Sequence, residues 1–540
     1  MESIKVERLD HLGIISGIIK ELGLIRMIDE RIPPDPEEAI TTGEAVAGMI
    51  LNGLGFSQRP PSLTPQFFAN KPLERLFRPG VRAAYFNRFK LGRSLDKVFA
   101  YGCDTLFSEL SLAVCQQEGI DRRFRHVDTT TFSLYGDYVP ERDEQAILIT
   151  HGYSKARRPD LKQVVLELMT APDGGIPLVS QSWDGNASDN RIFQERARAL
   201  IEAFKATPSP AYLVADSKLY TQKNASFLAQ LPFLTRIPES LQVVQQLIQQ
   251  AWAWNQWEQG DENYRYQRVE LCHYGMAQRW VVIFSQAAWQ RAEGTVARAQ
   301  RHEQDAIQKQ LYHLQAQRFP SEEEARARLH QVAAKWTYHQ VAQVECTSQA
   351  RYARTGRPTP TTPIKGRDWQ LHVTVAPDLA SRQAQRQRKA CFVLGTNIEA
   401  TAVSDDQILP HYKGQGTTER GFRFLKEPMF FTSSLFVKKP SRIQGLLMVM
   451  TLALLVYAVA QRRMRHQLAR HGETLPNQIG QPTPTPTLRW IFQLLEGINV
   501  VSVVIQRQVQ VLFEGLTDLR KKILQLFGKT VGQIYQLSSA

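Results

Sequence analysis

The sequence predicts an α/β protein in which helices flank a mixed β-sheet. Two patterns support this fold class. Apolar residues recur at helical spacing over residues 9–28 and 95–118. From residue 124 onwards, short runs rich in Val, Leu and Ile alternate with turn residues, as strands do. The chain has 540 residues, 43% of them hydrophobic, which is enough to bury large cores in about two to four domains.

Five strands are expected in the central part of the chain, over residues 124–134, 162–169, 176–183, 211–216 and 232–238. The turn sequence Pro-Asp-Gly-Gly at 172–175 joins the second and third strands into a hairpin. Ser188-Asp189 can cap a helix that follows over 189–204, and for Asp189 a capping role is expected rather than metal binding. Another short helix separates the fourth and fifth strands. The order β-β-β-α-β-α-β is that of a ribonuclease-H-like core, in which the first and fourth strands are neighbours.

The charge and cysteine content narrow the class of protein. Lys and Arg total 66 against 52 acidic residues, a net charge of +14, which suits a polyanionic partner but does not require one. The five cysteines include no C-x-x-C pair, so a disulfide framework or a zinc site is not expected, and a reducing compartment fits. Charges at the N-terminus argue against a signal peptide. The apolar segment 443–460 is expected to be a buried core helix and not a membrane span.

The other segments flank or interrupt the core. Residues 1–120 are expected to form a helical N-terminal domain, for either DNA binding or dimerisation. Residues 121–239 and 396–475 would be the two parts of the core. The interval 240–395 has strands and a long charged helix of its own and is too long for a loop, so we expect an inserted α+β domain. Residues 476–540 are expected to be a Pro-rich linker and a helical segment over 488–526.

Three acidic residues stand in settings that suit metal-dependent chemistry. Asp128 follows the apolar residues of the first strand, Asp216 ends the fourth strand, and Glu419 opens a helical stretch. Carboxylates are hard oxygen ligands of the kind that Mg²⁺ prefers, and a metal pair can both activate a nucleophile and stabilise a leaving oxygen in phosphoryl transfer. The alternative is that each acid is an ordinary turn or surface residue. The combined order, strand-Asp, strand-Asp, helix-Glu, favours the metal site.

The region around Glu419 resembles a known signature. The chain is similar to DDE transposases of bacterial insertion sequences, in the insertion sequence 4 superfamily and its insertion-sequence-1634-like branch. That group carries Tyr, two residues, Arg, three residues, Glu, six residues and Lys. Tyr412, Glu419 and Lys426 match at those spacings, whereas Gln415 stands at the Arg position. The aromatic residue that the family places four residues after its second acid is matched by Tyr220.

The resemblance implies roles for these residues. Asp128, Asp216 and Glu419 would be the catalytic ligands of two Mg²⁺ ions, for which Mn²⁺ can substitute. Tyr412 and Lys426 would hold DNA phosphates beside the metals. Gln415 carries no charge, so the phosphate contact of the signature arginine could come instead from one of three nearby basic residues, Lys413, Arg420 or Arg423. A basic loop with Lys155, Arg157 and Arg158 either contacts the DNA backbone or is simply solvated.

The same resemblance implies an activity. The protein would bind the terminal inverted repeats of its insertion sequence and catalyse strand cleavage and transfer to target DNA. A homodimer in the complex with double-stranded DNA, a cytoplasmic, nucleoid-associated location in a prokaryote and no membrane contact are expected. The alternative is a catalytically inactive or domesticated DNA-binding protein on the same fold.

Overall fold

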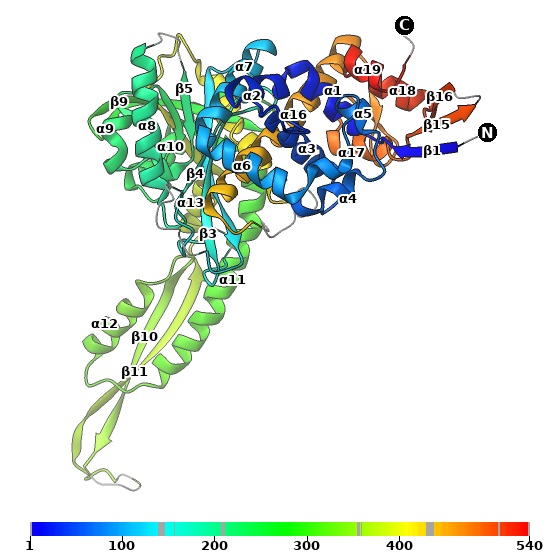
Figure 1. The fold of residues 1–540 in the computed structure, drawn as a ribbon. Helices are drawn as coiled ribbons and strands as arrows, with labels where there is room; N and C mark the ends of the chain where they lie inside the picture. The colour runs from blue at the N-terminus through cyan, green and yellow to red at the C-terminus, as the bar shows by residue number, and fades with distance from the viewer. Residues whose placement is uncertain are drawn as a thin grey trace. The chain divides into compact units, whose positions relative to one another are not determined.

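The structure is a computed structural model that describes residues 3–138, 146–155, 157–206, 211–353, 357, 359–427, 437–505 and 508–537 (Figure 1). The chain divides into two compact units. The first comprises Met1–Thr235 and Gln407–Ala540, and the second comprises Arg236–Asp406. Asp128, Asp216 and Glu419 therefore all belong to the first unit, which both ends of the chain build together.

The sheet of the first unit has the strand order β4-β3-β2-β5-β6. Its strands are β2 (Phe124–Leu134), β3 (Lys162–Thr170), β4 (Pro177–Trp183), β5 (Tyr212–Ala215) and β6 (Phe233–Arg236). β3 is antiparallel to both β2 and β4, whereas β5 runs parallel to both β2 and β6. The five expected strands are thus confirmed, and so is the predicted pairing of the first strand with the fourth.

Helix α16 (Pro440–His471) is the central core element of the first unit. It is long and apolar enough to span a membrane, but 89% of its apolar window is buried inside the structure, as the sequence predicted for a core helix. The buried hydroxyl of Thr451 has a partner in this core, because it forms a 3.0 Å hydrogen bond with the Ser180 hydroxyl of β4. Near the C-terminal end of the helix, Arg462 forms an ion pair with Asp173, which ties α16 to the β3–β4 turn.

The N-terminal segment packs around α16 and is largely helical, as expected. Its helices are α1 (Leu12–Leu22), α2 (Leu24–Arg31), α3 (Thr42–Leu54), α4 (Thr64–Phe68), α5 (Leu73–Leu76), α6 (Arg88–Tyr101) and α7 (Cys103–Gln117). One part of the prediction was wrong, because β1 (Ser3–Arg8) is a strand. It pairs antiparallel with β15 near the other end of the chain, so its hydrogen-bond partners come from far away in the sequence.

The helical prediction for 488–526 was also wrong in its middle. The segment forms α17 (Leu488–Leu494), β15 (Asn499–Ile505), β16 (Gln508–Glu514) and α18 (Asp518–Gln525), and α19 (Lys529–Ile534) follows. Val500, Val501, Val503, Val504 and Ile505 make β15 dense in β-branched residues, which favour strands over helices. Within the expected Pro-rich linker, β13 (Leu475–Pro476) and β14 (Pro482–Thr483) pair in a short hairpin.

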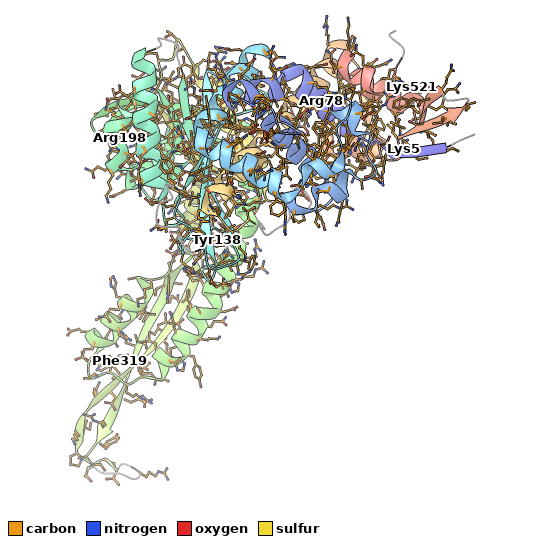
Figure 2. The ribbon with its side chains drawn as sticks, viewed as in Figure 1. Lys5, Arg78, Tyr138, Arg198, Phe319 and Lys521 are labelled. Atoms are coloured by element: carbon orange, nitrogen blue, oxygen red, sulfur yellow. The ribbon has the colours of Figure 1, made fainter. Side chains whose placement is uncertain are left out.

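The second unit contains two antiparallel sheets. The strands β7 (Glu258–Gln259), β8 (Tyr264–His273), β9 (Met276–Ser285) and β12 (Cys391–Thr396) form the first, and β10 (His339–Tyr352) pairs with β11 (Ile364–Pro377) in the second. Its helices are α10 (Gln242–Trp254), α11 (Gln286–Ala316), α12 (Glu322–Ala333) and α13 (Leu379–Ala390). Phe319, labelled in Figure 2, exchanges two backbone hydrogen bonds with Trp369 and so fixes the α11–α12 connection to β11.

Four further helices lie in or next to the first unit. Between the strands of the first unit lie α8 (Asp189–Ala206) and the short α9 (Ala225–Leu228). Helix α14 (Asp405–Lys413) begins at the end of the second unit, and α15 (Gly416–Leu425) follows it and carries Glu419. Helix α15 packs on β2, β3 and α16.

Candidate active site

The parallel pairing of β2 with β5 brings two of the acids to one edge of the sheet. His126 of β2 lies opposite Val214 of β5. Two residues further along each chain, the same register places Asp128 opposite Asp216, which directly follows the end of β5. Because side chains alternate along a strand, both carboxylates belong to the same face as His126 and Val214. The expected pairing of the two parallel strands is confirmed, with Asp128 on β2 and Asp216 one residue beyond the end of β5.

Asp128 sits in an electrostatically unfavourable position for a carboxylate. Burial raises its pKa to about 6, and the nearby carboxylates of Asp216 and Asp189 act in the same direction. The ammonium group of Lys155 and a 2.7 Å hydrogen bond from the Thr129 backbone N–H oppose the rise but do not cancel it. The negative charge at this strand edge is therefore only partly compensated by the chain, which is the setting that a bound cation would relieve.

Asp216 is held by the turn that follows β5. Its carboxylate accepts a 2.9 Å hydrogen bond from the Lys218 backbone N–H and caps the short 3-10 helix Ser217–Leu219. The Thr235 hydroxyl donates to the Asp216 carbonyl at 3.0 Å and anchors the backbone to β6. Tyr220, which matches the family pattern, is buried in the core, where its ring is 6.4 Å from that of Phe233. The turn therefore fixes Asp216 while its aromatic residue serves packing.

Helix α15 runs along β2 on the face that carries Asp128. Just before the helix, Gly414 is so close to the sheet that a Cβ atom there would lie 2.8 Å from the His126 ring. At its end, the Lys426 ammonium is 5.7 Å from the centre of the Phe132 ring. His126, Asp128 and Phe132 share one face of β2 because they are separated by even numbers of residues. The helix thus runs along β2 from His126 to Phe132, and Asp128 lies between these two residues on the strand.

The register of α15 assigns its side chains to different flanks. Thr418, Gly421, Phe422 and Leu425 are buried against the sheet and α16, and Thr418 hydrogen-bonds Thr170 of β3 at 2.7 Å. With roughly 100° between successive residues, Glu419 and Lys426 fall together on the flank that faces β2. Burial lowers the pKa of Lys426, and so does Lys155, whereas Asp128 raises it. Lys426 therefore lies in the electrostatic neighbourhood of Asp128, as expected.

The three acids do not form a closed metal site in this conformation. Among the residues that the structure describes, no three His, Cys, Asp or Glu side chains are grouped closely enough to hold a metal ion. Asp128 and Asp216 are near neighbours, whereas Glu419 is exposed on α15. The expected convergence of all three carboxylates is therefore absent here, and the part that is present is the aspartate pair beneath the glutamate helix.

A network around Asp189 departs from the sequence prediction. Of the expected cap Ser188-Asp189, Ser188 does cap α8, because it accepts a 3.3 Å hydrogen bond from the Arg191 N–H, whereas Asp189 serves another purpose. The Asp189 carboxylate accepts a 2.6 Å hydrogen bond from the Thr129 hydroxyl and forms ion pairs with Lys155 at 3.2 Å and Lys218 at 3.6 Å. These hydrogen bonds and lysines hold the pKa of Asp189 below its usual range, although burial opposes this. No local sequence signal links residues so far apart.

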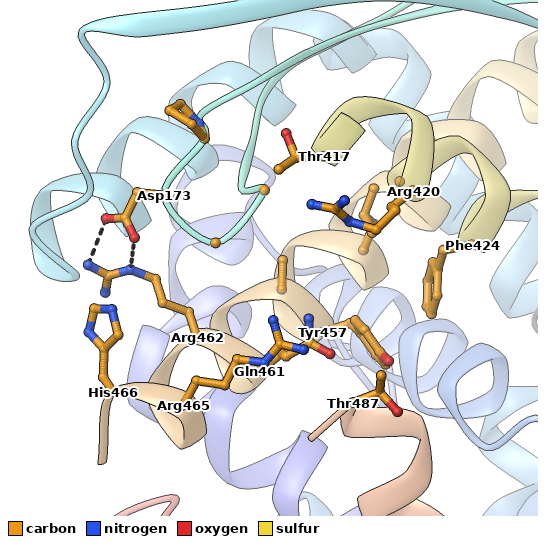
Figure 3. A pocket seen from close by; sticks show the side chains of 16 residues that line it. Asp173, Thr417, Arg420, Phe424, Tyr457, Gln461, Arg462, Arg465, His466 and Thr487 are labelled. Atoms are coloured by element: carbon orange, nitrogen blue, oxygen red, sulfur yellow. Dashed lines mark hydrogen bonds and ion pairs between the residues drawn. The ribbon is translucent and has the colours of Figure 1, made fainter. Parts of the chain in front are cut away.

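The remaining candidates occupy varied positions. Arg157 is exposed on its loop, and Arg158 forms a 2.7 Å ion pair with Asp160. Tyr412 and Lys413 end α14, and Gln415 is buried at the start of α15, where no side-chain hydrogen bond caps the helix. Arg423 is exposed one turn after Glu419, which makes it better placed than Arg420 to replace the signature arginine. Arg420 instead lines a cavity on the opposite flank of α15 (Figure 3).

Comparisons with known proteins identify the family. No curated protein matches the chain. A solved structure of the piggyBac transposase in a synaptic complex with hairpin DNA is similar, with 8% identity and a TM-score of 0.33 over 89% of this chain and 77% of that one, which is too weak a likeness to support an inference. Residues 4–112 match a domain of unknown function, DUF4277, and residues 120–456 match the transposase DDE domain. Because the second match covers more than half of the chain, the protein belongs to the transposase DDE domain family and is a transposase that acts on DNA.

Proposed function

We propose that this protein is a bacterial insertion-sequence transposase of the insertion sequence 4 superfamily, in the insertion-sequence-1634-like branch. It binds the terminal inverted repeats of its element as a homodimer in the prokaryotic cytoplasm. It then catalyses Mg²⁺-dependent strand cleavage and strand transfer into target DNA. The strand order supports a ribonuclease-H-like core, and the second unit corresponds to an insertion domain within that core.

The observation that carries this proposal is the placement of Asp128 and Asp216 on adjacent parallel strands beneath α15. Carboxylate oxygens are the hard ligands that Mg²⁺ takes, and it keeps several waters, so few protein ligands are needed. The raised pKa of Asp128 supports the fit, because burial and two nearby carboxylates leave this edge with negative charge to be neutralised. These donors also suit Mn²⁺, which takes the same oxygen ligands.

Metal binding and DNA binding are assigned to different side chains. Asp128, Asp216 and Glu419 are proposed to hold two metal ions, which when bound activate the attacking oxygen and stabilise the leaving oxygen. Glu419 completes the set when its exposed side chain turns from solvent toward β2. Lys426 and Lys155, both close to Asp128, neutralise phosphates of the scissile strand and so position the phosphodiester over the carboxylates. Tyr412 is assigned a further backbone contact.

A cleavage assay on the element's own ends tests the proposal. Purified protein is incubated with duplex DNA that carries one end of the element, with Mg²⁺, with Mn²⁺ or with a chelator. Cleavage at the junction between element and flank in the presence of either metal, and none with the chelator, is the expected result. Tight binding of that end with no cleavage under any metal condition would favour the alternative, an inactive DNA-binding protein on this fold.

A further inference from the structure

A basic cavity lies on the flank of α15 that faces away from Asp128. Its volume is about 540 Å³, it is open to solvent on one side, and it is lined by the β3–β4 turn, α15, α16 and Thr487 (Figure 3). Arg420 enters it from α15, whereas Arg462, Arg465 and His466 enter from α16. Figure 3 shows Arg420 and Arg465 directed toward the same space between the two helices. The cavity thus combines basic groups from two helices that meet in the core.

Among the described residues, the basic groups of this cavity exceed its acidic ones. Arg462 is already neutralised, because Asp173 accepts two hydrogen bonds from it at 2.7 and 2.8 Å. Arg465 donates to the carbonyl oxygens of Pro486 and Thr485, at 3.1 and 3.3 Å, and these carry no net charge. In the part of the chain that the structure describes, neither Arg420 nor Arg465 has a carboxylate partner. Burial lowers the pKa of Arg465, and Arg420 adds to that effect, so the two cations lie close enough to repel.

The wall of the cavity has an apolar part as well. Phe424 and Tyr457 line it, with ring centroids 4.6 Å apart and planes tilted by 39°, and Leu454 lies beside them. A water molecule occupies about 30 Å³ of liquid, so a cavity of 540 Å³ has room for a group several times larger than a phosphate ion. Paired guanidinium groups match a phosphate, and aromatic side chains match the sugar and base that accompany it in a nucleic acid.

We propose that this cavity binds one nucleotide unit of a DNA strand, with its phosphate between Arg420 and Arg465 and its sugar and base against Phe424 and Tyr457. The proposal rests on the family's action on DNA and not on the catalytic roles of the three acids. The same helix then holds DNA on one flank and presents Glu419 on the other. The site fixes the path of the strand without taking part in the chemistry.

Binding of a fluorescent duplex with a single-stranded extension, in metal-free buffer, tests the site. Arg420→Ala and Arg465→Ala should each weaken binding about tenfold, and the slope of log K against log salt should fall by about one because each variant removes one cation from the phosphate. The double variant should weaken binding by less than the product of the two single effects, since both arginines hold one phosphate. Arg470→Ala is the matched control, an exposed arginine on the same helix, and should change binding less than twofold.

The variants also show which results would overturn the proposal. Within the described residues Arg420 makes no side-chain hydrogen bond, so its truncation should leave the melting temperature unchanged and keep the test readable even if Arg465→Ala unfolds the protein. An effect no greater than that of Arg470→Ala would reject the nucleotide site. Stabilisation of the wild type but not of the double variant by inorganic phosphate, with DNA binding unchanged in both, would show a small-anion site instead. Cleavage at the wild-type rate by Glu419→Gln, in a protein that still needs Arg420 for binding, would reject the catalytic role of Glu419 and leave this inference standing, so failures of the two proposals can be told apart.

Discussion

The two flanks of α15 carry opposite chemistry although their residues are adjacent in the sequence. Glu419 is exposed on the same flank as Lys426, which lies in the electrostatic neighbourhood of Asp128, whereas Arg420 lines a cavity with a surplus of positive charge. Consecutive helical residues differ by roughly 100°, so one short helix can serve both surroundings. A basic residue next to Glu419 in the sequence therefore need not lie in the same surroundings as Glu419. Its partner is decided by the flank on which it lies.

The largest effect is expected on the acidic flank. Asp128→Asn, Asp216→Asn and Glu419→Gln each remove the charge of one proposed metal ligand and keep the size of the side chain. Cleavage should fall by more than about a hundredfold in each, because even changes to residues behind metal ligands cost about 10–100-fold. Binding to terminal-repeat DNA in metal-free buffer should persist, since removal of a negative charge near phosphate does not weaken it. Cleavage at the wild-type rate by any of the three would show that the wrong acid was chosen.

A smaller effect is expected from the cation on the same flank. Lys426→Ala should reduce cleavage about tenfold at moderate salt, because it removes one charge-assisted hydrogen bond to a phosphate near the reacting bond. Lys521→Ala is a suitable control, since Lys521 is an exposed lysine on α18 with only a 3.5 Å pair to Asp518. If cleavage by the Lys426 variant matches that of the control across a salt series, the placement of Lys426 beside Asp128 has no role in catalysis.

The raised pKa of Asp128 should also change how the stability of the metal-free protein depends on pH. A carboxyl whose pKa is raised to about 6 binds more protons in the folded state than in the unfolded state, so its contribution lowers stability as pH rises through about 4 to 6. Asp128→Asn should therefore be more stable than the wild type above pH 6, by about 1–3 kcal/mol, and equally stable near pH 4. Thermal unfolding in a chelating buffer at several pH values measures this difference. A variant less stable than the wild type at neutral pH would mean that Asp128 has a structural role.

The core could be predicted from the sequence where the signal was local. Strand periodicity and the Pro-Asp-Gly-Gly turn indicate all five strands, and Asp216 could be placed because it directly follows an apolar strand. The β1–β15 pairing could not be predicted, since it joins the two ends of the chain and leaves no trace in either segment alone. The ion pairs of Asp189 with Lys155 and Lys218 could not be predicted either, because these residues are far apart in the sequence. The sides on which Arg420 and Arg423 lie needed the helix register against the sheet, which only the packing of α15 supplies.

Direct titration with Mn²⁺, followed by electron paramagnetic resonance in the presence of terminal-repeat DNA, tests the central claim. The wild type should bind about two ions per chain, as expected of a two-metal site. Asp128→Asn, Asp216→Asn and Glu419→Gln should each lose at least one of them, whereas Asp518→Asn, which removes a fully exposed acid on α18, should keep both. Wild-type stoichiometry and affinity in any of the three site variants would contradict the assignment of that acid as a metal ligand.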